Sequence, residues 1–139
     1  GLILLSPWLD LRSSSMSSRT NSNAWSPFGR LDMLEYTTHY LAGADPNQAA
    51  TSPVLGSFDG FPPTMIETST AEYLYPDACL FRDLLIAESI EVVWREEDNA
   101  LHGWQLFPDI LPEAKRSVLA MSHFMTRAPV ALTKRPMLG

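Results

Sequence analysis

Residues 62–98 decide the fold, and they read PPTMIETSTAEYLYPDACLFRDLLIAESIEVVWREED. The six residues after the two prolines, 64–69, have the composition of a strand, and residues 91–95 have the same character. Between them, residues 77–88 predict a helix with an apolar face. That face consists of Ala78, Phe81, Leu84 and Leu85. A strand, a helix and a second strand in this order predict a parallel β-α-β unit.

Three further segments extend this unit toward both ends of the chain. Leu2–Leu5 is an apolar block closed by Ser6 and Pro7, which suits a strand buried on both faces. Residues 31–41 predict a short amphipathic helix that ends near Gly43. Its apolar residues are Leu31, Leu34, Tyr36 and Leu41. A closing helix is predicted from an apolar stripe formed by Ala114, Val118, Met121 and Met125.

The predicted fold class is therefore α/β, a parallel sheet covered by helices. In such sheets functional groups gather at the C-terminal ends of the strands, which here are the loops after residue 69 and after residue 95. A length of 139 residues suits one domain, which we place at residues 1–127. Within it, residues 12–50 form an irregular excursion, and residues 128–139 are expected to be an irregular tail.

Composition excludes several classes of protein. The chain has 10 Lys and Arg against 16 Asp and Glu, a net charge of −6, and no basic stripe that could follow a phosphate backbone, so nucleic acid is not an expected partner. The apolar run at residues 1–9 is far shorter than the ~20 residues of a membrane-spanning helix. A single cysteine, Cys79, excludes an internal disulfide and permits a reducing compartment such as the cytoplasm.

Two titratable residues follow neighbouring strands of the predicted sheet. Glu72 lies just beyond the second strand and His102 just beyond the third, so a parallel sheet brings both to one edge. A carboxylate that accepts a hydrogen bond from one imidazole nitrogen fixes the tautomer, and the other nitrogen can then take a proton from a nucleophile. The pair makes two thirds of a hydrolytic triad, in the acid-then-His order of α/β-hydrolases.

Five motifs in a fixed order resemble a known family. They are Leu4–Asp10 (LLSPWLD), Tyr40–Pro46 (YLAGADP), Phe61–Pro63 (FPP), Glu72–Leu74 (EYL) and His102–Phe107 (HGWQLF). Each motif is weak alone, but their order and spacing resemble those of the hormone-sensitive-lipase-like esterases, the fold-3 group of the α/β-hydrolases. The resemblance spans residues 1 to about 125.

The resemblance implies an enzyme that hydrolyses small apolar carboxylic esters through a serine acyl-enzyme, without a metal or organic cofactor. Glu72 falls on the acid of the triad and His102 on its general base. Because the family more often has Asp as the acid, Glu72 is a departure, and Asp77 is the alternative acid.

The resemblance also suggests which residues contact substrate. Gly103 and Trp104 would shape the turn that holds His102, and Trp8 either lines an acyl pocket or fills the core. The excursion at residues 12–50 corresponds to part of the family's lid. Its candidate substrate contacts are Trp25, Phe28, Met33 and Leu34.

Two motifs of the family are missing from these 139 residues. They are the Gly-x-Ser-x-Gly nucleophile elbow and the His-Gly-Gly segment that supplies oxyanion-hole amides. The glycine pair of residues 56–60 follows a proline loop and precedes no predicted helix, so we do not interpret it as an elbow. We therefore expect the C-terminal part of a hydrolase domain.

Two further interpretations stay open. The chain could be a noncatalytic remnant that binds a ligand or partner, and the edge of Leu2–Leu5 could then support self-association. His39 and Glu35 have helical spacing for a shared metal ion, but a single pair lacks the further ligands that a zinc site needs.

Overall fold

The computed structural model describes residues 1–12 and 30–127 and has a three-stranded parallel sheet at its centre. The strands are β1 (Leu2–Leu5), β2 (Thr64–Ser69) and β3 (Val92–Glu97), in the order β1-β2-β3. Leu5 pairs with Glu67, and Glu67 pairs with Arg95. The predicted α/β class and parallel sheet are confirmed.

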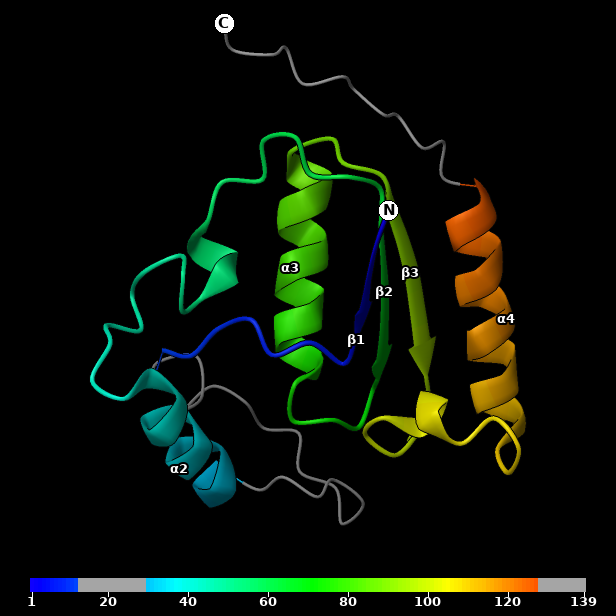
Figure 1. Ribbon diagram of the computed structural model, residues 1–139, viewed down its shortest axis with the longest axis horizontal. Coiled ribbons are helices and arrows are strands. Elements are labelled where there is room, and N and C mark those ends of the chain that lie inside the picture. The colour runs from blue at the N-terminus through cyan, green and yellow to red at the C-terminus, as the bar shows by residue number, and fades with distance from the viewer. Residues whose placement is uncertain (13–29, 128–139) are drawn as a thin grey trace, which may run out of the picture.

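Helices cover both faces of the sheet (Figure 1). They are α2 (Arg30–Leu41), α3 (Tyr75–Ala87) and α4 (Pro112–Arg127), with short 3₁₀ turns η1 (Pro53–Leu55) and η2 (Trp104–Leu106). Figure 1 shows α3 on one face, α4 on the other, and α2 beside the carboxyl ends of the strands. No helix within residues 1–12 and 30–127 has the length and apolar character to cross a membrane.

The main core lies between the sheet and α3. Side chains alternate across a strand, so β2 sends Ile66 toward α3 and its neighbours Met65 and Glu67 toward α4. Ile66 packs with Phe81 and Leu85, as the helical periodicity predicts. Phe58 joins them with its ring edge-on to Phe81, at a centroid distance of 5.3 Å. Every residue of β2 is buried, as expected for the central strand of the sheet.

The structure corrects the predicted face of α4. The buried residues are Ala114, Ser117 and Phe124, whereas Val118 and Met125 are 40% and 68% exposed. Both stripes begin at Ala114 and fit a helical period, so periodicity alone could not separate them. The bulky ring of Phe124 is buried, and the helix is therefore rotated toward it.

Helix α2 and the end of β3 also differ from the predictions. Among residues 33–41 of α2 the buried ones are Met33 and Thr37, while Leu34 and Tyr36 are half exposed; the side chain of Leu31 lies outside the described part of the helix. Met33 packs against Tyr73 and Leu74, and this contact rather than the spacing of leucines sets the face. Strand β3 continues two residues beyond Arg95 to Glu97, because the backbone of β2 remains available for pairing as far as Ser69.

Candidate active site

Glu72 and His102 meet at the carboxyl edge of the sheet, as the sequence predicted. Glu72 lies in the turn between β2 and α3, and His102 lies in the loop between β3 and η2. The imidazole Nδ1 is 2.8 Å from Glu72 Oε2. Glu72 is 3% exposed and the His102 side chain is 28% exposed, so the carboxylate is enclosed while the imidazole reaches the surface.

The second oxygen of Glu72 has two donors of its own. Ser6 Oγ donates to Oε1 at 2.6 Å, and the Ser69 backbone N–H donates to the same atom at 3.1 Å. Hydrogen bonds to a carboxylate stabilise its charged form, and buried carboxylates need such partners. Glu72 therefore offers a fixed acceptor to Nδ1 of His102.

The His102 turn is set by the next residue. Gly103 has φ of +73°, in the left-handed region that glycine adopts without steric cost. An added Cβ would meet only Leu106 Cδ1, at 3.7 Å, so the backbone angle rather than space requires glycine here. Trp104 follows at 2% exposure and its backbone N–H donates to the Leu101 carbonyl, which closes the turn.

A cavity of about 230 Å³ opens beside His102. Its lining residues are Ser6, Trp8, Met33, Tyr36, Leu74 and His102. Trp8 and Met33, both predicted as substrate contacts, are on its wall. Gly103 and Trp104 are not among its lining residues, because Trp104 is buried in the protein. Leu34 is likewise not on this wall, whereas Trp25 and Phe28 fall outside the described residues.

Asp77, the alternative acid, has a different role in the structure. It is buried, and its Oδ2 accepts hydrogen bonds from the backbone N–H groups of Leu9 and Asp10 at 2.9 and 3.0 Å. These bonds fix the segment that follows Trp8. Asp77 thus anchors the wall of the cavity, and Glu72 is the carboxylate on His102.

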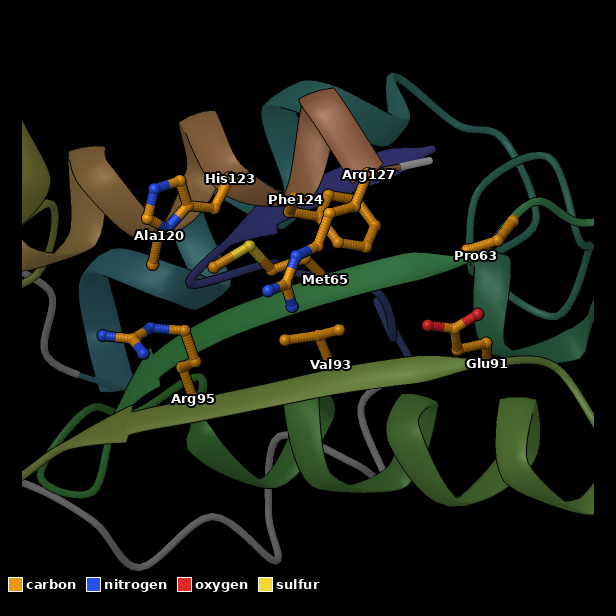
Figure 2. Close-up of a pocket in the computed structure, with 9 residues that line it drawn as sticks. All are labelled: Pro63, Met65, Glu91, Val93, Arg95, Ala120, His123, Phe124 and Arg127. Atoms are coloured by element: carbon orange, nitrogen blue, oxygen red, sulfur yellow. The ribbon is translucent and has the colours of Figure 1, made fainter. Parts of the chain in front are cut away.

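A second cavity of about 260 Å³ lies between the sheet and α4 (Figure 2). Its apolar lining includes Met65 and Val93 from the strands and Phe124 from α4. Figure 2 shows His123 at one end of this cavity and Glu91 at the other, so the two do not form an acid–imidazole pair. The cavity beside His102 is therefore the better candidate site.

Two other titratable candidates lack the geometry of a reactive site. His39 and Glu35 lie 3.7 Å apart with both side chains more than 70% exposed, and residues 1–12 and 30–127 hold no group of three metal-ligating side chains. Burial raises the pKa of the Cys79 thiol, which keeps it in the less nucleophilic protonated form.

Residues 1–106 match the family model of the α/β-hydrolase fold. The chain belongs to this family. It is 30% identical over 127 residues to an esterase of Acinetobacter venetianus and 28% identical over 126 residues to an acetyl-hydrolase of Streptomyces hygroscopicus. Each match covers 91% of this chain, and the chain spans 42% of the length of each relative.

Solved structures of this family have the same fold. The esterase EstE5, in crystals soaked with p-nitrophenyl butyrate, superposes with a TM-score of 0.76 at 26% identity, covering 88% of this chain and 41% of that chain. An esterase of the bacterial hormone-sensitive lipase family superposes with a TM-score of 0.79 at 24% identity, covering 91% and 42%. The resemblance drawn from the five motifs is confirmed, and the relatives named above are esterases and an acetyl-hydrolase.

Three residues of the cavity wall, Ser6, Tyr36 and Leu74, were not predicted as site residues, and Ser6 is the one that hydrogen-bonds to Glu72. Ser6 was interpreted only as the end of β1, yet its hydroxyl contacts Glu72. Ser6 has φ of +44°, which is uncommon for a residue with a side chain and has no signature in the sequence. Its position before a proline marks the end of β1 but does not indicate this contact.

Proposed function

We propose that this chain carries the acid and the general base of a serine-type carboxylic ester hydrolase. The observation that carries the proposal is the 2.8 Å contact between His102 Nδ1 and the buried carboxylate of Glu72, at the edge where a parallel sheet gathers its functional groups. The substrate is a small apolar ester, since the wall beside His102 is mostly apolar.

The reaction follows from this arrangement. His102 accepts through Nε2 the proton of a serine hydroxyl, whose oxygen attacks the ester carbonyl. The proton then passes to the departing alcohol, which leaves an acyl-enzyme. His102 next removes a proton from water, the water oxygen attacks the acyl carbon, and the carboxylic acid leaves as the proton returns to serine. Glu72 stays ionised throughout and stabilises each imidazolium.

In this proposal the serine comes from chain outside these 139 residues, which contain no Gly-x-Ser-x-Gly elbow. The test measures hydrolysis of p-nitrophenyl acetate and butyrate, with labelling by a fluorophosphonate probe. Two proteins are compared: this chain alone, and this chain joined to the upstream segment of its gene. We expect turnover and labelling only in the joined protein, and loss of turnover in His102→Ala. Full activity of His102→Ala, or silence of both folded proteins, would overturn the proposal.

The open edge of β1 favours a second candidate function, a binding module that associates through this strand. Among the described residues β1 pairs with β2 alone, and Leu5 is 40% exposed. An unpaired strand edge is a template for another strand. Sedimentation velocity should then show a dimer that Leu5→Lys converts to monomer, whereas a wild-type monomer at all concentrations would exclude it.

A further inference from the structure

We infer that Ser6 is a positioning residue that holds the Glu72 carboxylate in the plane required by His102. The inference rests on the proposed function, because it concerns the same carboxylate–imidazole pair. It adds the residue that follows β1, a strand that lies on the far side of β2 from the His102 loop.

The contacts of Glu72 divide between its two oxygens. Oε2 faces His102, while Oε1 accepts hydrogen bonds from Ser6 Oγ at 2.6 Å and from the Ser69 backbone N–H at 3.1 Å. A carboxylate that makes only one hydrogen bond can still turn its plane about that hydrogen bond. Two donors at the ends of neighbouring strands, one just after β1 and one at the last residue of β2, fix its plane, and that plane directs Oε2 at Nδ1.

The backbone conformation at Ser6 places its hydroxyl beside Glu72. Ser6 is 4% exposed with φ of +44°, and its N–H donates to the Glu67 carbonyl at 2.7 Å as the last link between β1 and β2. A left-handed conformation at a residue other than glycine costs of order 1 kcal/mol and persists only where surrounding contacts enforce it. Contacts hold the chain on both sides of this conformation: the Ser6 N–H is bonded to Glu67, and Asp77 accepts from the Leu9 and Asp10 N–H groups.

Ser6 itself is not placed as the nucleophile. A hydroxyl has one hydrogen, and that of Ser6 is donated to the carboxylate. Its oxygen therefore acts through Glu72 and His102 rather than on an ester, although the residue lines the cavity. If Ser6 positions Glu72, removal of its hydroxyl should change the tautomer ratio of the His102 imidazole. A purely structural role of Ser6 would leave that ratio unchanged.

The experiment measures the nitrogen-15 shifts of the His102 imidazole in this 139-residue chain, at a pH well above the ordinary imidazole pKa. The variants are Ser6→Ala and Ser6→Gly, which both remove the hydroxyl, while glycine also suits the left-handed φ. Thr68→Val is the control, since it removes a buried hydroxyl from β2 that makes no hydrogen bond to Glu72. Dispersed amide spectra establish that each variant is folded.

We expect the ratio of the Nδ1–H to the Nε2–H tautomer to fall about fivefold in both Ser6 variants, the effect of one hydrogen bond of about 1 kcal/mol. The ratio should not change in Thr68→Val. An unchanged ratio in Ser6→Ala and Ser6→Gly overturns the inference. So does recovery in Ser6→Gly alone, because the effect would then come from the backbone.

Kinetics of the joined protein separate this inference from the proposed function. There Ser6→Ala should lower kcat about 10-fold with KM unchanged, as expected for a group that acts on the reacting imidazole and not on substrate binding. If the joined wild type fails to hydrolyse esters, the proposed function fails and the tautomer ratio still decides the role of Ser6. If hydrolysis depends on Glu72 and His102 but neither kcat nor the ratio responds to Ser6, only the inference fails.

Discussion

Two buried glutamates, Glu67 and Glu72, are close in the sequence and have different partners. Glu67, 0% exposed on the α4 side of β2, accepts from Arg95 Nε at 2.9 Å and from Gln105 Nε2 at 3.3 Å. Glu72, 3% exposed beyond the strand, accepts from Ser6 and the Ser69 N–H and faces His102. Both carboxylates are enclosed and hydrogen-bonded.

The difference lies in the cation that each one faces. A guanidinium stays charged at every working pH, so the pair of Glu67 and Arg95 is permanent and serves the fold. An imidazole gains and loses its proton near neutral pH, so the pair of Glu72 and His102 can take part in proton transfer. Burial and hydrogen bonding alone therefore do not separate a structural carboxylate from a reactive one.

The largest effect should follow from exchanging the carboxylate that faces the imidazole. In the protein joined to its upstream segment, Glu72→Gln should lower kcat by about 10³–10⁴-fold, because the amide no longer fixes the required tautomer or stabilises the imidazolium. The matched change Glu67→Gln should leave most of kcat in place and lower stability instead. Ester hydrolysis and urea unfolding of the two variants test this directly. Equal losses of kcat would contradict the assignment of Glu67 as structural and Glu72 as reactive.

Breaking the permanent pair should give the next largest effect, on stability. Arg95→Met leaves the Glu67 carboxylate buried with Gln105 as its remaining side-chain donor, and we expect the free energy of unfolding to fall by about 3 kcal/mol. The value is at the low end for a buried pair because the Arg95 side chain is 38% exposed. Urea denaturation measures it.

The double variant Glu67→Met/Arg95→Met provides the control for that result. It removes both charges, so it should recover much of the loss, since the unpaired charge causes the damage. A double variant as unstable as Arg95→Met alone would mean that side-chain packing, not charge, is lost there.

Removal of the Asp77 carboxylate, which holds the cavity wall, should have a smaller effect on stability. Asp77→Ala leaves the Leu9 and Asp10 N–H groups without their carboxylate acceptor and should cost about 2 kcal/mol of stability. Asp77→Asn keeps an acceptor oxygen and should cost less. Thermal unfolding of both variants measures the difference, and an Asn variant as damaged as the Ala variant would point to the charge instead of the hydrogen bonds.

Much of this site could be predicted from the sequence, for a specific physical reason. The β-α-β pattern of residues 62–98 fixes the parallel sheet, and a parallel sheet brings the residues after β2 and β3 together, so Glu72 and His102 could be paired in advance. The face of α4 could not be predicted, because two stripes fit the same period. Ser6 could not be predicted either, because its contact depends on a backbone angle that composition does not encode.

The smallest effect is expected at Thr68, between the two glutamates. Its Oγ1 is buried with no hydrogen-bond partner, so the folded protein has given up the hydration of this hydroxyl without compensation. Valine has nearly the same shape and a high strand propensity, so Thr68→Val should raise the free energy of unfolding by up to about 1 kcal/mol. Thr68→Ser keeps the hydroxyl, loses the methyl group and should be destabilised. A loss of stability in Thr68→Val would contradict this prediction. It would mean that the Thr68 hydroxyl has a hydrogen-bond partner in the folded protein, as the Glu67 carboxylate of the same strand does.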